Sequence, residues 1–232
     1  IIMLFLYHII ISILTLFSPI IIIYRILKNK EDKKRYKEKF SISSKKRIKG
    51  KLIWFHGASV GEILSIMPLV KYYEKKKSVA QILVTTSTLS SSRVLQKYKL
   101  RKTIHQFYPI DNFFFTNKFL SFWKPCMAVF VDSEIWPCMY KNINEQKIPL
   151  ILLNARLTKK TFKKWMCLKS FGKSIFKNIT IAFPQNLETK SYLKKLEINK
   201  IHNLGNLKFA ENFEENLDKI EINLKKELKR KK

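Results

Sequence analysis

The chain has 232 residues, which is long enough for one well-packed domain with extra segments, and its 46% hydrophobic and 13% aromatic content excludes global disorder. Its 46 lysines and arginines outnumber 17 acidic residues, and the net charge of +29 favours a polyanionic partner such as nucleic acid, anionic lipid or a phosphorylated substrate. Composition leaves these three open, and biased codon usage explains much of the charge equally well.

Residues 1–24 form an almost unbroken apolar run. At 1.5 Å per residue, a helix of this length crosses a hydrocarbon core of about 30 Å. The positive charge follows the run, and no small-residue cleavage site separates the two, which disagrees with a cleaved signal peptide. We therefore predict a membrane anchor helix over 1–24. Spanning and interfacial orientations both stay open, because Pro19 could bend the helix.

Residues 25–51 carry thirteen lysines and arginines against three acids, Glu31, Asp32 and Glu38. Dense basic charge directly after a hydrophobic span places the following chain in the cytoplasm. The same charge attracts anionic lipid headgroups. We predict a basic juxtamembrane segment over 25–50 that touches an anionic membrane surface.

From residue 51 onward, short apolar runs alternate with amphipathic segments. Several runs are apolar without alternation, which is typical of parallel strands covered on both faces. Repeated βα units predict an α/β fold, a doubly wound parallel sheet, over 51–210. The charged tail over 211–232 is expected to be a surface helix or a linker. The expected strands are 51–56, 81–88, 103–110, 126–133, 149–156, 180–185 and a weaker 200–207.

Small residues follow the first expected strand, in the string HGASVGE at 56–62. Ser59 and Gly61 let the backbone approach a ligand closely. Glu62 lies near a helix start, where it could pair with the helix dipole or act as a general base. The residues alone favour the capping role, and the dipole should then lower the pKa of Glu62. Pro68 either kinks this helix or marks its beginning.

Hydroxyl side chains follow the second strand, in TTSTLSSSRV at 85–94. Hydroxyls such as that of Thr86, backbone N–H groups at a helix start and the Arg93 guanidinium suit a phosphate. An ordinary helix cap explains the same hydroxyls.

Two further strands end in polar residues. Asp132 and Glu134 follow the fourth strand beside Trp136, which could be a platform for a sugar or part of the core. Asn154 and Arg156 end the fifth strand. Because ligands of open parallel sheets bind at the carboxyl ends of strands, these side chains are candidates for substrate binding.

Cysteine and histidine patterns argue against metal chemistry. The cysteines are odd in number and lack CxxC spacing, and the four histidines form no HExxH motif, so we expect no disulfide framework, no metal and no cofactor. The free thiols favour a reducing compartment. Motifs for NAD binding, P-loop hydrolysis and the α/β-hydrolase triad are absent. The cysteines are Cys126, Cys138 and Cys167.

Taken together, these strings resemble the amino-terminal domain of the transferases of Kdo (3-deoxy-D-manno-octulosonic acid) of lipopolysaccharide synthesis. Each string is weak alone, but they follow the family's order, and with the anchor the resemblance covers residues 1 to 210. The strings are IWFHGASVGE (53–62), PLV (68–70), LVTTST (83–88) with SSRV (91–94), YPID (108–111), KP (124–125), VDSEIWP (131–137), IPLILLNARLT (148–158), PQN (184–186) and GNLKF (205–209).

The resemblance implies a two-domain glycosyltransferase of the GT-B type with a Rossmann-like amino-terminal half. It also implies inverting transfer of Kdo from CMP-Kdo to a lipid A precursor, lipid IVA, at the cytoplasmic face of the cell inner membrane. Glu62 then becomes the expected general base, against the capping role that the residues alone favour. Glu134 is a second functional carboxylate by the same resemblance, although Asp132 and Ser133 stand where relatives often have Glu-Thr. Arg93 and Arg156 are implied contacts for acceptor or phosphate.

The chain departs from the family in length, because relatives are close to twice as long and the donor-binding domain would begin near its end. We therefore expect a chain truncated to the acceptor half, with CMP-Kdo held by a second domain that is either missing or encoded separately. A non-catalytic lipid-binding module of the same family is the alternative. A nucleic-acid partner has only the net charge in its favour, since no zinc pattern or aromatic RNA-binding string is present.

Overall fold

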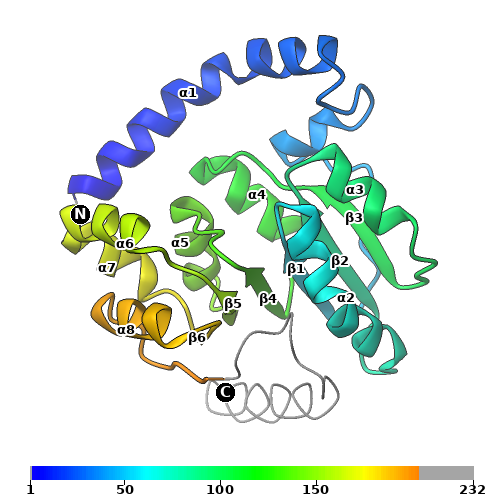
Figure 1. Cartoon of the computed structure of the whole chain (residues 1–232). Coiled ribbons are helices and arrows are strands. Elements are labelled where there is room, and N and C mark those ends of the chain that lie inside the picture. Colours follow the sequence, from blue (N-terminus) through cyan, green and yellow to red (C-terminus); the bar gives the residue numbers. More distant parts are fainter. Residues whose placement is uncertain (1, 204–232) are drawn as a thin grey trace.

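Six parallel strands form the centre of the structure, a computed structural model that describes residues 2–203 (Figure 1). Their order across the sheet is β3-β2-β1-β4-β5-β6. Each neighbouring pair is parallel, so the predicted α/β fold with a doubly wound parallel sheet is confirmed. The strands are β1 (Leu52–His56), β2 (Gln81–Thr86), β3 (Thr103–Phe107), β4 (Met127–Val131), β5 (Leu150–Ala155) and β6 (Ile181–Pro184).

Of the weaker strand expected over 200–207, the structure contains a parallel bridge between Ile201 and Ala182. The GNLKF string and the expected tail over 211–232 lie outside the described residues.

Helices cover both faces of this sheet (Figure 1). Alternate residues of β1 point into two separate apolar clusters, with Trp54 in one and Phe55 in the other. The first cluster includes residues of α4, α5 and α7, and the second includes residues of α2 and α3. Burial on both faces explains why the strands are apolar without alternation. The helices are α1 (Ile2–Leu27), the 3₁₀ helix η1 (Tyr36–Phe40), α2 (Val60–Lys75), α3 (Leu89–Gln96), α4 (Phe113–Trp123), α5 (Pro137–Glu145), α6 (Lys159–Cys167), α7 (Lys169–Phe176) and α8 (Leu187–Lys195).

Side-chain caps fix where most of these helices begin. In each case an oxygen accepts a hydrogen bond from a backbone N–H of the first turn, which satisfies a donor that has no partner within the helix. The capping residues are Ser59, Thr88, Asn112, Thr158 and Asn186. Helix α2 begins at Val60, so Pro68 lies inside it and does not mark its start.

The long first helix covers the predicted anchor. Within α1, residues Phe5–Leu27 have a mean hydropathy of 2.3 and are long and apolar enough to cross a membrane. Only 11% of the most apolar window is buried against the rest of the protein, so most of the helix surface is open.

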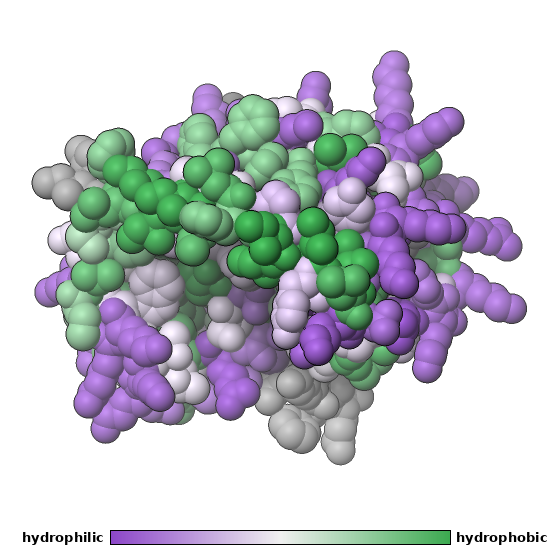
Figure 2. Space-filling model, turned by 90° about the horizontal axis from the view of Figure 1, so that it is seen from above, coloured by the Kyte–Doolittle hydropathy of each residue, from purple (hydrophilic) through white to green (hydrophobic). Residues whose placement is uncertain are grey.

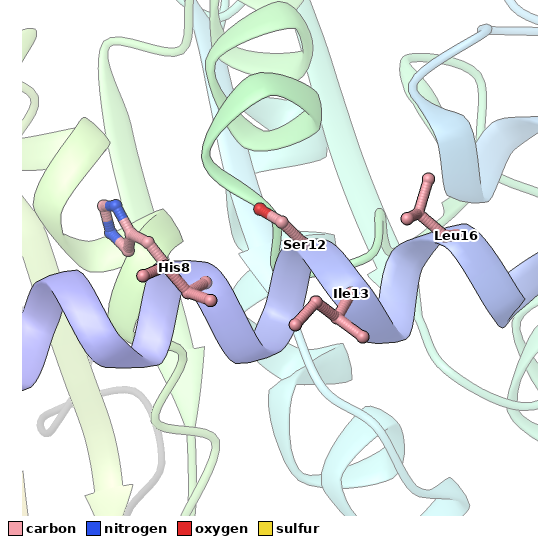
Figure 3. Close-up of a pocket in the computed structure, with 5 residues that line it drawn as sticks. His8, Ser12, Ile13 and Leu16 are labelled. Atoms are coloured by element: carbon pink, nitrogen blue, oxygen red, sulfur yellow. The ribbon is translucent and has the colours of Figure 1, made fainter.

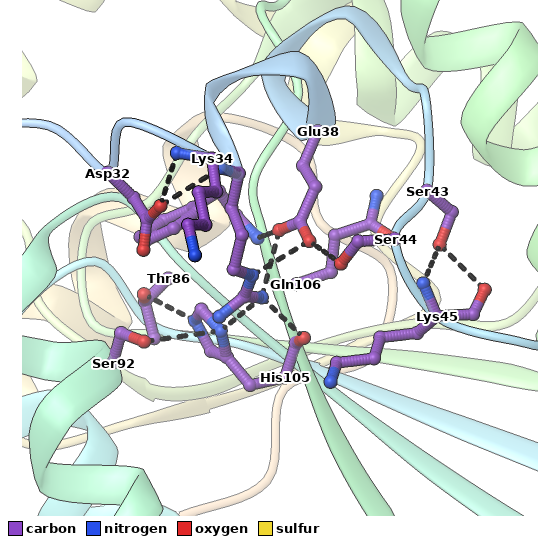
Figure 4. Close-up of polar contacts among 12 residues, drawn as sticks. Asp32, Lys34, Glu38, Ser43, Ser44, Lys45, Thr86, Ser92, His105 and Gln106 are labelled. Atoms are coloured by element: carbon purple, nitrogen blue, oxygen red, sulfur yellow. Dashed lines mark hydrogen bonds and ion pairs between the residues drawn. The ribbon is translucent and has the colours of Figure 1, made fainter.

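The basic segment after α1 is folded onto the sheet edge (Figure 4). Glu38 of η1 is fully buried, and its carboxylate accepts hydrogen bonds from two guanidinium nitrogens of Arg35, Nε and Nη2, at 2.9 Å each. Its Oε2 also accepts the backbone N–H of Phe107 at 2.8 Å. Arg35 donates to the carbonyl of His105 at 2.8 Å, so two backbone groups at the open edge of β3 are paired. The segment therefore covers an edge strand, which protects it from pairing with other chains.

His105 is held neutral in this cluster. Arg35 Nη2 lies 2.9 Å from its Nδ1, and because a guanidinium only donates, Nδ1 accepts and the proton is on Nε2, 2.9 Å from Thr86 Oγ1. Burial, and then the charge of Arg35, lower the pKa of His105 to about 3. Protonation of the buried His105 ring is therefore unfavourable in the folded protein.

We expect this histidine to make the protein sensitive to acid. An unfolded chain protonates His105 near its ordinary pKa and the folded chain only near pH 3, so the unfolded state binds the extra proton in between. The free energy of unfolding should fall as the pH drops through this window, by up to about 1.4 kcal/mol per pH unit. Urea unfolding at a series of pH values should show a shallower decline for His105→Gln. Equal slopes for the two proteins would contradict this assignment.

Candidate functional site

The loops after β1 and β4 lie side by side at the point where the strand order reverses. Strand β1 pairs with β4 through His56 and Phe130, and the chain runs outward to β2 on one side and to β5 on the other. Such a switch point at the carboxyl ends of parallel strands is where ligands of this architecture bind. Glu62 follows β1 and Glu134 follows β4, so both predicted carboxylates flank it.

Glu62 and Ser59 form a reciprocal cap at the start of α2. Ser59 Oγ accepts from the N–H of Glu62 at 3.3 Å and donates to Glu62 Oε1 at 2.8 Å. Glu62 Oε2 accepts from the N–H of Ala58 at 2.8 Å, which holds the carboxylate at the rim of the sheet. At Gly57 a Cβ would lie 3.1 Å from the Glu62 Cβ, so a side chain there would press on this carboxylate, whereas a Cβ at Gly61 would meet open space.

The expected lowering of the Glu62 pKa is wrong. Burial raises the pKa of this carboxyl, and the negative charges of Glu134 and Asp132 raise it further, outweighing the hydrogen bonds from Ser59 and Ala58. The expectation considered only the local helix start and missed the burial of Glu62, which is the largest cause, and the two carboxylates that follow β4. A raised pKa makes Glu62 a stronger base than a solvated glutamate.

Aromatic rings and one histidine hold Glu134 in place. Trp136 Nε1 donates to Glu134 Oε2 at 3.0 Å, and the Tyr140 hydroxyl donates to the Glu134 carbonyl at 2.8 Å. His56 Nε2 lies 3.4 Å from the same Oε2, and its ring stacks on Tyr108 at a centroid distance of 4.0 Å. Trp136 therefore donates a hydrogen bond to Glu134 and also packs against the first apolar cluster.

His56 and Tyr108 are site residues that the sequence reasoning missed. Both are buried, and His56 Nδ1 lies 3.0 Å from Thr85 Oγ1. Its position in the sequence could have identified His56, because it is the last residue of β1 and the first residue of the string that contains Glu62.

The ends of β4 and β5 have an unusual backbone. Asp132, directly after β4, and Asn154, within β5 where the pairing with β6 shifts register, have positive φ angles of 62° and 51°. The Asn154 side chain is 1% exposed, and among the described residues neither of its amide atoms has a hydrogen-bond partner. An unpaired buried amide costs about 1–3 kcal/mol, so this residue is suited to bind a polar group that approaches the rim. Arg156 is exposed next to it, and its N–H donates to the Asp132 carbonyl at 3.2 Å.

The structure does not bring all predicted contacts together. Thr86 is buried and its hydroxyl is bonded to His105, so it faces the basic segment at the edge of the sheet. Arg93 is exposed on α3. Thr88 caps α3 by accepting the N–H of Ser91, and Ser91 Oγ donates to the Ala58 carbonyl at 3.0 Å, which ties the two loops together. This arrangement fits the cap explanation better than a preformed phosphate site.

Within residues 2–203, no group of three or more histidine, cysteine, aspartate or glutamate side chains is arranged to hold a metal ion. The negative charges of Glu134 and Asp132 act on the Glu62 carboxyl. The arrangement supplies a raised-pKa carboxylate, a second carboxylate oriented by an indole N–H and an unpaired amide. Such a set can accept a proton and bind hydroxyl groups.

The coupling between the two loops can be tested directly. Glu134→Gln removes one of the negative charges that raise the pKa of Glu62, so that pKa should fall. The measurement is a ¹³C NMR titration of the Glu62 carboxyl carbon. The control is Glu145→Gln, which changes an exposed glutamate on α5 and should leave the titration curve in place. A curve unmoved by Glu134→Gln would show that the carboxylates do not interact.

Comparison with known proteins shows that the chain matches a known family. The family described as "3-Deoxy-D-manno-octulosonic-acid transferase (kdotransferase)" matches residues 34–211. A 3-deoxy-D-manno-octulosonic acid transferase of Rickettsia bellii is 39% identical over 193 residues, which are 82% of this chain and 46% of the relative. The corresponding protein of Rickettsia felis is 41% identical over 161 residues, which are 68% of this chain and 34% of the relative. The chain therefore spans less than half the length of these relatives.

Among solved structures, a UDP-N-acetylglucosamine 2-epimerase aligns with a TM-score of 0.51 and 14% identity, covering 68% of this chain and 49% of that protein. At this identity the likeness supports the fold and nothing further.

Proposed function

Because the chain belongs to the 3-deoxy-D-manno-octulosonic acid (Kdo) transferase family, we propose that it is the acceptor-binding half of a glycosyltransferase that moves Kdo from CMP-Kdo to lipid IVA. The observation that carries the proposal is the half-buried Glu62 at the switch point of the sheet, with its pKa raised by burial and by Glu134 and Asp132. In this role Glu62 removes the proton from the acceptor hydroxyl while the hydroxyl oxygen attacks the anomeric carbon of the donor. The bond from that carbon to the phosphate of CMP breaks, CMP leaves from the opposite face, and the configuration inverts.

The remaining rim residues have binding roles in this proposal. Glu134, fixed by Trp136 and His56, accepts hydrogen bonds from the hydroxyl groups of the acceptor. Asn154 bonds a polar group of the sugar, which would satisfy its buried amide. Arg156 and Arg93 are exposed cations that attract the acceptor's phosphates. The donor is bound chiefly by a second domain, and no metal takes part.

The location of the acceptor supports a membrane-bound enzyme. Lipid IVA is an acidic lipid, and the net charge of +29 favours an anionic surface. An apolar helix followed by a basic segment supports a position of the domain at the cytoplasmic face of the inner membrane.

A transfer assay tests the proposal. The chain is combined with the carboxyl-terminal half of the R. bellii relative and given CMP-Kdo and lipid IVA, and the products are examined by mass spectrometry. We expect lipid that has gained Kdo, and none when either half is omitted. Acceptor binding without transfer, while the intact relative is active in the same assay, would instead identify a non-catalytic lipid-binding module.

A further inference from the structure

Helix α1 is docked along the domain by one of its faces. The Tyr7 hydroxyl donates to Asp111 Oδ2 at 2.8 Å, and the Asn112 amide donates to Ser12 Oγ at 3.3 Å. The ring of Tyr7 contacts Phe171 at a centroid distance of 5.9 Å. Figure 3 shows His8 and Ser12 on the same side of the helix, and His8 contacts the Phe113 ring at 5.5 Å.

The docked face runs the whole length of the helix. The less exposed residues of α1 recur every three or four positions, as expected for one side of a helix packed on a surface. They are residues 7, 8, 11, 15, 18, 22, 25 and 26, of which Ser18 and Ile22 are buried. This side of α1 therefore faces protein from its first turns to its last.

The opposite face is apolar and open. Phe5, Leu16 and Leu27 are 63%, 77% and 75% exposed, and Phe114 at the start of α4 adds a ring that is 66% exposed. Figure 2 shows a continuous hydrophobic band over this side of the molecule, bordered by hydrophilic side chains. Contiguous exposed apolar surface bordered by polar side chains is typical of sites that contact a membrane or another protein.

Charge points to an anionic lipid surface as the partner of this band. Two of the three acids in the basic segment, Glu31 and Glu38, are buried and paired with cations. The segment that continues from α1 therefore presents mainly lysines to the outside. These lysines can pair with the phosphates of anionic headgroups while the open apolar face of α1 meets the acyl chains.

We propose that α1 lies in the plane of an anionic bilayer surface, with its outer face in lipid and its inner face kept on the domain. A spanning helix would carry its docked face, and the charged domain bound to it, into the hydrocarbon, where charged side chains are strongly disfavoured. In the proposed function, this in-plane position keeps the bilayer surface close to the helix that follows Glu134. Asp111 also accepts the N–H groups of Cys138 and Met139 at the start of α5, so one carboxylate ties α1 to the helix that follows Glu134.

The depth of three residues tests the orientation. Phe5, Leu16 and Leu27 are spaced by eleven residues, which places them on one helix face and spreads them over about 33 Å along the axis. Each is changed to cysteine in a Cys126→Ser, Cys167→Ser background that keeps only the buried Cys138, and is labelled with an environment-sensitive fluorophore. Quenching by lipids that carry nitroxides at shallow or deep positions then reports the depth of each label in phosphatidylglycerol-containing vesicles.

We expect one common shallow depth for all three labels and about tenfold weaker binding to pure phosphatidylcholine. Leu64→Cys, an exposed leucine on α2, is the matched control and should stay unquenched. A deep central label with two shallow ends would show a spanning helix and overturn the proposal. Three labels that all stay in water would overturn it as well. Neither readout involves sugar transfer, so its result is independent of the transfer assay.

Discussion

Replacing Glu62 with glutamine is expected to lower the rate of Kdo transfer by about 10²- to 10⁴-fold, the contribution typical of a general base. Glutamine has nearly the same shape and keeps a carbonyl oxygen that can accept the Ala58 N–H, so the cap of α2 should largely survive. Acceptor binding and the free energy of unfolding should therefore change little. The measurement is single-turnover transfer by the chain together with a donor-binding half.

The matched control and the pH profile sharpen this result. Glu145→Gln makes the same chemical change on an exposed part of α5 and should leave transfer unchanged. In the unaltered protein the rate should fall as the pH drops through the raised pKa of Glu62, because protonation removes the base. Normal turnover by Glu62→Gln would leave Glu62 with only its capping role, which the structure already shows.

Replacing Glu38 with alanine is expected to lower the free energy of unfolding by about 3–5 kcal/mol, the range for breaking a buried ion pair. The fully buried carboxylate accepts hydrogen bonds from Arg35, the N–H of Phe107 and the Ser44 hydroxyl, and its loss leaves the Arg35 charge without its paired carboxylate and the Phe107 N–H without its acceptor (Figure 4). The edge of β3 should then open first. Urea unfolding measures the loss, and hydrogen exchange at the Phe107 amide locates it.

An exposed pair provides the comparison for Glu38. Lys141 and Glu145 are 3.7 Å apart on the surface of α5, and Glu145→Ala should cost less than about 0.5 kcal/mol because water and salt screen such pairs. Equal losses for the two alanine variants would mean that the basic segment contributes no more to folding than an ordinary surface ion pair.

Local patterns were sufficient to predict the six strands of the sheet and the long apolar helix. Uninterrupted apolar runs such as that of β5 predict strands buried on both faces, and Ser59 before an amphipathic segment is typical of a helix start. The resemblance, carried by strings near strand ends, pointed to Glu62 and Glu134 before their positions were known. Their catalytic and binding roles remain predictions.

The sequence by itself determined the parallel α/β fold, the long apolar helix and the carboxylates at strand ends, because these depend on side-chain period and on neighbours within a few residues. Only the tertiary structure partly buried Glu62 and placed β1 beside β4, so that burial first, and then the charges of Glu134 and Asp132, reversed the expected direction of its pKa shift. It also turned Thr86 toward His105 and laid α1 along the domain. Desolvation and Coulomb interactions depend on distance in space, and residues far apart in sequence set them.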